Sequence, residues 1–406
     1  MAGRVNLSRH HHGSHLDLLK DLSVVPFPRE PDAIIVPTAR HAAALVPVIE
    51  LAAKLNCTLV ALCSKWSSAR DVVALAEGRT KLIAVDIAEV PQGVVPRFET
   101  CRVLAGSRFE RWTDLSLKRN FGLLLARLIG WERVVFLDDD IEVPESTHLR
   151  EAAGLTDHYA AVGLTIDGMP DNSVVCHAYR DAGGQQDTFV GGGAMAVGTR
   201  EITSFFPNIY NEDWFFLLDD DGLRRTTTTG TAVQQPYDPY REERARMEEL
   251  GDVLAEGLFW LLDNGRPLSD ATAAHWRNFL DERVRFITDV MAMVARMDGQ
   301  PGHRDRMLGA LKAARGRCQS IEPDLCVRYV HAWQRDRTTW RRHVEHTFRS
   351  VTKGMDDAER RSLKGVRAML RSLGLRDRTA HLRLPSEPPH HDLAHFDLPF
   401  SIAVGQ

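Results

Sequence analysis

The chain has 406 residues, of which 44% are hydrophobic and 26% charged, and its formal net charge is −4. This composition is typical of a globular protein with one large core or two domains, and it excludes a disordered or fibrous chain. The weak negative charge gives no general attraction to nucleic acid or to an anionic membrane. The sequence has no apolar run long enough to span a membrane and no secretory signal pattern. We therefore expect a cytoplasmic protein with no transmembrane segment and no nucleic-acid partner.

The cysteine and histidine spacings indicate neither a disulfide framework nor a zinc site. The six cysteines are scattered without a C-x-x-C pair, so we expect reduced and mostly packed thiols. The histidine-rich stretch at 10–15 is typical of a mobile tail, a weak metal-binding tract or a cloning remnant, and we assign it no role in function. Residues 1–31 are interpreted as an N-terminal tail.

Residues 32–240 alternate short apolar runs with longer amphipathic segments. Such alternation is typical of a parallel sheet covered by helices on both faces, so we predict an α/β domain with a mostly parallel sheet. The predicted strands cover Ala33–Thr38, 57–64, 81–87, Arg133–Leu137 and 158–168, and the predicted helices cover 41–55, 69–77 and 114–130.

After residue 240 the pattern changes to successive helices. Segments between 242 and 351 show apolar residues at three-and-four spacing, which predicts a helical C-terminal region at 241–380. We expect its apolar faces to pack on the preceding domain or on a second copy of the chain, as in a homodimer. The proline- and histidine-rich end, 381–406, is predicted to be an extended segment that packs over the body or stays mobile.

Polar residues follow several predicted strands at the point where each strand ends. Thr38 and Arg40 follow the first strand, Ser64 and Lys65 follow the second, and an acidic triplet at 138–140 follows a later one. Ligands bind at the carboxyl ends of the strands in open parallel sheets. We therefore predict that these groups gather at one edge of the sheet.

The acidic triplet, Asp138, Asp139 and Asp140, is the first candidate site. Like charges repel and lose hydration when buried, so such a triplet either sits at an exposed strand end or holds a cation. If the strand continued, Asp138 and Asp140 would share one side, with Cα atoms about 7 Å apart. They could then share a hard divalent cation with diphosphate oxygens. The alternative is a solvated acidic turn.

Later segments carry further candidate residues. The glycines at 191–193 precede alternating small residues, which indicates a close backbone approach leading into a strand. Glu212 and Asp213 precede an aromatic run that starts like a helix, so they either stabilise its first turn or form a catalytic pair. A second acidic triplet at 219–221 is interpreted as a turn, with a rival metal site as the alternative.

Together these segments resemble the GT-A glycosyltransferases, particularly those of family 2. The matching segments, in the family's order, are "IIVPT", "KRNFG", "FLDDD", "GGGAMAV" and "NEDW". The resemblance covers 32–239, about half of the chain. It implies a GT-A-like, Rossmann-like domain and a metal-dependent enzyme, a hexosyltransferase, that moves a sugar from a UDP- or GDP-linked donor to an acceptor hydroxyl. Mn²⁺ or Mg²⁺ would be the cofactor.

The resemblance also implies roles on the donor side. Asp138 would lie near the nucleotide and, with Asp140, would contribute to the metal site that bridges the sugar diphosphate. Thr38 and Arg40 would line the nucleotide pocket. Arg119, in the "KRNFG" helix, would approach a phosphate or the ribose.

On the acceptor side, the resemblance implies that Asp213, beside Glu212, is the general base. A carboxylate that removes the acceptor proton on the face opposite the leaving group gives inversion of configuration. The glycine segment would let the backbone lie beside the donor sugar. The residues of that segment are Gly191, Gly192 and Gly193.

The sequence departs from the family where the second strand ends. The family commonly has acidic residues followed by a serine there, whereas this chain has Ser64, Lys65 and Trp66, and Trp66 could stack on the nucleobase. Some GT-A enzymes also complete the metal shell with a histidine. The candidates are His177, His331, His343 and His346.

Three other functions remain open from the sequence. A retaining glycosyltransferase shares the acidic triplet and differs beneath the sugar. A nucleotidyltransferase would bind its metal at the α-phosphate, although "PTARHAAAL" lacks the glycine-rich basic loop that grips a triphosphate. The last alternative is a non-catalytic binding scaffold.

Overall fold

The computed structural model describes residues 18–19, 25–169, 173–185, 189–298 and 300–375, together with the backbone of 380–383. The histidine-rich stretch at 10–15 lies outside these residues. So does the chain after 383, where an extended segment is predicted.

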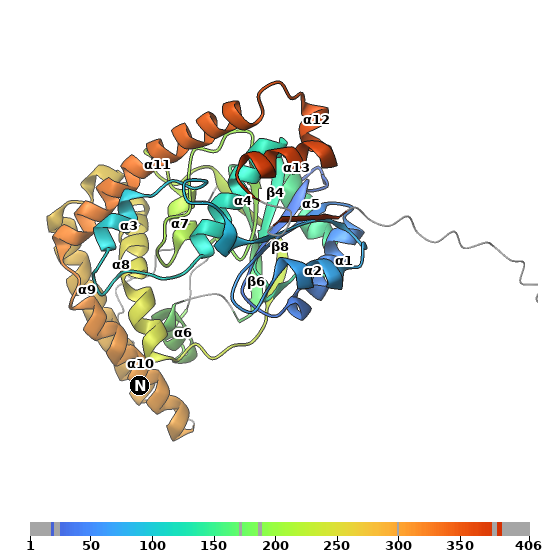
Figure 1. The fold of residues 1–406 in the computed structure, drawn as a ribbon. Helices are drawn as coiled ribbons and strands as arrows, with labels where there is room; N and C mark the ends of the chain where they lie inside the picture. Colours follow the sequence, from blue (N-terminus) through green and yellow to red (C-terminus); the bar gives the residue numbers. More distant parts are fainter. Residues whose placement is uncertain are drawn as a thin grey trace, which may run out of the picture.

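A nine-stranded sheet forms the centre of the described part of the chain (Figure 1). Its strands are β1 (Ala33–Thr38), β2 (Thr58–Cys63), β3 (Lys81–Asp86), β4 (Arg133–Leu137), β5 (Ile141–Glu142), β6 (Ala161–Gly168), β7 (Ala194–Gly198), β8 (Thr226–Gln234) and β9 (Ala380–Arg383). They are ordered β5-β8-β6-β7-β4-β1-β2-β3-β9. The predicted parallel pairing is present among β1, β2, β3 and β4.

The sheet as a whole is mixed, which corrects the prediction of a mostly parallel sheet. β7 runs antiparallel to both of its neighbours, β4 and β6, and the edge strands β5 and β9 are also antiparallel to their partners. β6 and β8 are parallel. The prediction was wrong because a helix between two strands was taken to imply parallel pairing, whereas a helix at Val174–Asp181 separates the antiparallel strands β6 and β7.

Helices cover both faces of the sheet and continue through the predicted C-terminal helical region. The α-helices are α1 (Val46–Lys54), α2 (Ala69–Ala76), α3 (Glu99–Leu104), α4 (Leu115–Ile129), α5 (Ser146–Leu155), α6 (Val174–Asp181), α7 (Glu212–Leu217), α8 (Glu242–Asp263), α9 (Ala273–Ala295), α10 (Pro301–Cys318), α11 (Pro323–Val351), α12 (Asp357–Arg361) and α13 (Leu363–Ser372). Short 3-10 helices lie at η1 (Ala42–Leu45), η2 (Ile87–Glu89) and η3 (Leu268–Asp270).

Alternate residues of the central strands face opposite layers, because successive strand side chains point to opposite faces. Ile34 and Val36 belong to a buried cluster with α1, α2 and α5. Ile35 belongs to a larger cluster that includes α4, α7 and the helices α8 to α11. Figure 1 shows these C-terminal helices beside α7 and away from α1 and α2. One face of the sheet and the C-terminal helices therefore share a continuous core.

Two further expectations can be compared with the structure. All six cysteines lie in the described residues and none forms a disulfide, and four of them are buried, as expected. Among the helices of the described residues, none is both long enough and apolar enough to cross a membrane.

Candidate active site

The carboxyl ends of β1, β2 and β4 meet at one edge of the sheet, as predicted. Lys118 of α4 joins the first two, since its Nζ donates to the Thr38 carbonyl at 2.8 Å and to Ser64 Oγ at 2.6 Å. Thr38 Oγ1 donates to Asp139 Oδ2 at 2.8 Å, which joins β1 to the end of β4. Burial lowers the pKa of Lys118, and Asp114, 3.1 Å away, opposes this shift.

The acidic triplet forms a turn after β4, with Ile141 N donating to the Asp138 carbonyl at 3.1 Å. Strand alternation therefore does not set the positions of the carboxylates, and each has different partners. Asp140 accepts a hydrogen bond from Arg40 at 2.8 Å, and Arg40 Nε lies 3.4 Å from Asp139. The three side chains are only 12–24% exposed, so the turn is not simply solvated.

Burial and the neighbouring charge of Asp138 raise the pKa of Asp140 to about 6, although Arg40 opposes this shift. The charge of Asp140 is thus incompletely compensated, and the carboxylate oxygens of the triplet are donors of the kind that suit Mn²⁺ or Mg²⁺. Within the described residues, no three His, Cys, Asp or Glu side chains form a complete ligand set. A cation held by Asp138 and Asp140 would need phosphate or water oxygens as its other ligands, as Mg²⁺ commonly does. The residues fit such an ion.

Arg119 of α4 lies at the centre of the site and is 2% exposed. Its Nη1 donates to Glu212 Oε1 at 2.7 Å, and its Nη2 donates to both oxygens of Asp138 at 2.9 and 3.1 Å. Burial lowers the pKa of Arg119, but the facing carboxylates outweigh burial and raise it overall. Arg119 therefore stays charged and connects the acidic triplet to the Glu212-Asp213 pair, rather than facing an open phosphate pocket.

The predicted close approach of the glycine segment is present, and its neighbours are Arg119 and Asp213. A Cβ atom added to Gly192 would lie 2.5 Å from Arg119 Nη1 and 2.9 Å from Asp213 Cβ. A Cβ on Gly193 would lie 2.5 Å from Ile141 Cδ1, whereas one on Gly191 would meet only ordinary contacts of 3.4 Å or more. Gly192 in particular lets the backbone lie against the buried arginine.

Glu212 and Asp213 occupy the first turn of α7, as predicted, but neither is its N-cap. That residue is Asn211, in a left-handed conformation with φ 60°. Asp213 Oδ2 accepts from Gly192 N at 2.5 Å and Oδ1 accepts from Trp214 N at 2.9 Å. Burial raises the pKa of Asp213, and burial raises that of Glu212 to about 7 against the opposing charge of Arg119. Two backbone hydrogen bonds thus hold Asp213, and the hydrogen bond from Arg119 holds Glu212.

A buried ion cluster in the C-terminal helices supports the start of α7. Asn211 Nδ2 donates to Asp252 Oδ1 at 2.9 Å, and Asp252 also accepts from Arg283 at 2.9 Å. Arg283 of α9, 0% exposed, pairs in addition with Glu249 and Glu256 of α8. Nothing in the sequence pattern indicated this cluster, because its members lie on helices whose mutual packing is tertiary.

Two more residues complete the edge of the site. Gln235 was not predicted: its N donates to the Asp140 carbonyl at 2.9 Å and its Oε1 accepts from Arg40 at 3.1 Å. Trp66 is 71% exposed beside the end of β1, with its N donating to the Ala39 carbonyl at 3.3 Å. No local signal marks Gln235, which precedes an ordinary proline-containing loop.

The remaining candidates lie apart from the acidic triplet or in other contacts. In the second triplet, Asp221 N donates to Asp219 Oδ1 at 2.9 Å, which is a turn, as interpreted. His177 hydrogen-bonds Tyr237 at 2.7 Å, and His343 lies 2.9 Å from the Val94 carbonyl. No histidine of the described residues completes a three-ligand set with the triplet.

No protein-family model matches the chain, and no curated protein does. Solved structures similar to it include the mannosyltransferase PcManGT from Pyrobaculum calidifontis in complex with GDP-Man and Mn²⁺. The identity is 16% and the TM-score 0.38, over 82% of this chain and 91% of the other. A similarity of this degree establishes neither a shared activity nor a shared fold.

Proposed function

We propose that the chain is a glycosyltransferase with a GT-A-like domain, which moves a sugar from a UDP- or GDP-linked donor to an acceptor hydroxyl with inversion. The link that Arg119 makes between Asp138 and Glu212 carries the proposal. Arg119 places the acidic triplet, whose carboxylates suit a metal ion bound to a diphosphate, in one cluster with the second carboxylate pair, Glu212 and Asp213. Sugar transfer requires both groups side by side, because the reacting atoms must be held in contact.

On the donor side, Asp138 and Asp140 would hold Mn²⁺ or Mg²⁺. When bound, the cation would offset the negative charge that develops on the leaving diphosphate. Arg40 is 43% exposed, so its guanidinium can turn from the triplet to a phosphate oxygen without disturbing the core. Thr38 fixes the middle carboxylate, Asp139, and thereby the shape of the turn.

On the acceptor side, Asp213 would act as the base. Its two oxygens accept backbone hydrogen bonds from Gly192 and Trp214, which hold the carboxylate in one orientation. Asp213 is partly exposed, whereas Glu212 is 6% exposed, so an acceptor hydroxyl can reach Asp213 more easily. Glu212 would instead position Arg119. Proton removal opposite the leaving diphosphate gives inversion, and general-base help is worth about 10²–10⁴-fold in rate.

The exposed indole of Trp66 would stack on the nucleobase. Trp66 lies next to the loop that carries Arg40, since its backbone bonds to Ala39. Its ring centroid is 5.7 Å from that of His41. A planar base stacked on the exposed face of the indole gains apolar contact area, which would replace the acidic base contact that family 2 members commonly provide.

The test is release of UDP or GDP from a panel of nucleotide sugars, measured with Mn²⁺ and a panel of hydroxyl-bearing acceptors present. Asp213→Asn should lower release at least about 100-fold, because the base is lost, and should leave nucleotide binding within about twofold. Asp221→Asn, an exposed aspartate in the turn after α7, is the matched control and should leave release unchanged. Full release in Asp213→Asn would disprove the base assignment, and no release by the native chain from any donor would disprove the transferase.

A further inference from the structure

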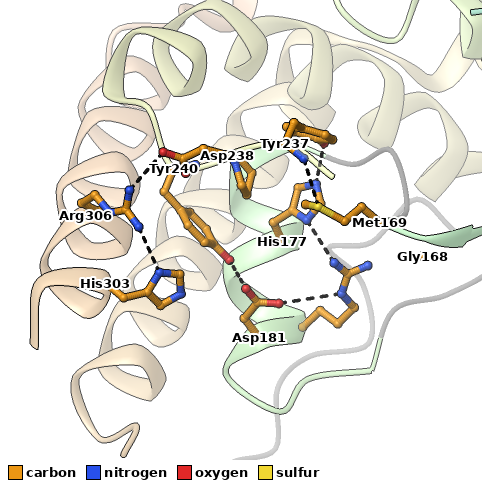
Figure 2. A pocket seen from close by; sticks show the side chains of 11 residues that line it. Gly168, Met169, His177, Asp181, Tyr237, Asp238, Tyr240, His303 and Arg306 are labelled. Atoms are coloured by element: carbon orange, nitrogen blue, oxygen red, sulfur yellow. Dashed lines mark hydrogen bonds and ion pairs between the residues drawn. The ribbon is translucent and has the colours of Figure 1, made fainter. Parts of the chain in front are cut away.

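A cavity of about 780 Å³ lies between the end of β6, helix α6, the segment 237–240 and helix α10. Figure 2 shows the side chains around it, with Tyr237 and His177 on one side and His303 and Arg306 on the other. Its volume falls within the range of about 300–1,000 Å³ that is typical of small-ligand sites. None of its lining residues belongs to the acidic triplet or to the Glu212-Asp213 pair.

The cavity adjoins the acidic triplet through a short stretch of chain. Gln234, the last residue of β8, pairs with Gly168, which lines the cavity. The next residue, Gln235, contacts Asp140 and Arg40, and Tyr237, two positions further on, lines the cavity again. A ligand in the cavity would therefore lie beside the end of the sheet where the donor is proposed to bind.

The charges that line the cavity are paired. Arg306 donates to Asp238 at 3.1 Å, and Arg180 lies 4.0 Å from Asp181. His177 is neutral, since burial lowers its pKa to about 3. The two arginines and two aspartates of the lining balance each other. The lining therefore has no surplus of positive or negative charge to attract a strongly ionic ligand.

The lining combines aromatic faces with groups that donate and accept hydrogen bonds. Tyr240 and His303 pack edge to face at a centroid distance of 5.4 Å, and His177 and Tyr237 do so at 5.6 Å. Tyr240 also donates to Asp181 at 2.5 Å. A sugar ring has faces of C–H groups that pack on aromatic rings and hydroxyls that both donate and accept, so it matches such a lining.

We propose that this cavity binds the acceptor, and that the acceptor is a neutral saccharide. The inference rests on the proposed function. In the transfer, the acceptor hydroxyl oxygen forms a bond to the anomeric carbon of the donor, and the bond from that carbon to the diphosphate oxygen breaks. The nucleoside diphosphate leaves with the bonding electrons. Asp213, which lies outside the cavity lining, takes the proton of a hydroxyl that extends from the cavity toward the donor.

The experiment is saturation-transfer difference NMR on the full chain with a mixture of maltose, cellobiose, lactose and mannobiose, and with sialyllactose as an anionic comparison. At least one neutral disaccharide should bind, and binding should weaken about fivefold in His303→Ala and in Arg306→Ala, each of which removes a polar contact. Both residues are at least partly exposed, so the fold should persist. Arg266→Ala, an exposed arginine paired with Asp270 outside the cavity, is the matched control.

The outcomes separate this inference from the proposed function. No disaccharide binding, binding that survives both cavity substitutions, or binding of sialyllactose alone would overturn the saccharide cavity. Titration with UDP and GDP is run in parallel on the same protein. Nucleotide binding without disaccharide binding would overturn the cavity and leave the transferase standing. Disaccharide binding without nucleotide binding would support a saccharide site but overturn its role as the acceptor site of a transferase.

Discussion

Replacing Arg283 by methionine should strongly destabilise the chain, because three carboxylates would lose their buried cation. Arg283 is 0% exposed and lies 3.0 Å from Glu249, 2.9 Å from Asp252 and 2.5 Å from Glu256. Breaking a buried ion pair by removing one partner costs about 3–5 kcal/mol.

Urea unfolding followed by circular dichroism at pH 7 and pH 5 measures this loss. The loss of unfolding free energy should be about 3–5 kcal/mol at pH 7 and smaller at pH 5, because the stranded acids protonate more easily there. Arg285→Met, at an arginine that is 66% exposed, is the matched control and should cost under about 1 kcal/mol. A loss below about 1 kcal/mol for Arg283→Met at pH 7, or a larger loss at pH 5, would refute the reasoning.

Three further predictions follow from other parts of the structure. Gly192→Ala should lower the rate of donor turnover at least about tenfold, because its Cβ would displace Arg119, whereas Gly191→Ala should not; steady-state kinetics compare them. Lys118→Met should lower the unfolding free energy by about 2–4 kcal/mol in urea titrations, because buried hydrogen bonds to two strand ends are lost. Burial raises the pKa of Glu256 from 4.5 to about 8, so the folded chain binds this proton more tightly than the unfolded chain does. The stability that this proton contributes is fully present below pH 4.5 and is lost as the pH rises to about 8. The urea midpoint should therefore be lower at pH 8.5 than at pH 6.

The parallel part of the sheet could be predicted because its strands are buried on both faces. Ala33–Thr38 and 57–64 are continuous apolar runs separated by amphipathic helices, and that pattern has few other solutions. The direction of β7 could not be predicted, because strand direction is set by which edge the chain reaches after α6. The short apolar run of β7 is compatible with either direction.

The gathering of Thr38, Arg40 and the acidic triplet at one edge was predictable, because the carboxyl ends of parallel strands must meet there. The partners of Arg119 were not, since its contacts join α4 to the start of α7, which is 93 residues further along the chain. Gln235 reaches the site through the pairing of β8 with β5, which places Gln234 opposite Ile141. Side chains placed by tertiary packing leave no periodic signal in the sequence.

The most direct measurement of the central claim is calorimetric titration of the full chain with UDP and GDP, each with and without Mn²⁺. The account predicts that one nucleoside diphosphate binds in a metal-dependent manner. It also predicts that Asp140→Ala loses this binding, whereas Asp221→Asn retains it. Failure of both nucleotides to bind with Mn²⁺ present, or unchanged metal-dependent binding in Asp140→Ala, would contradict the account.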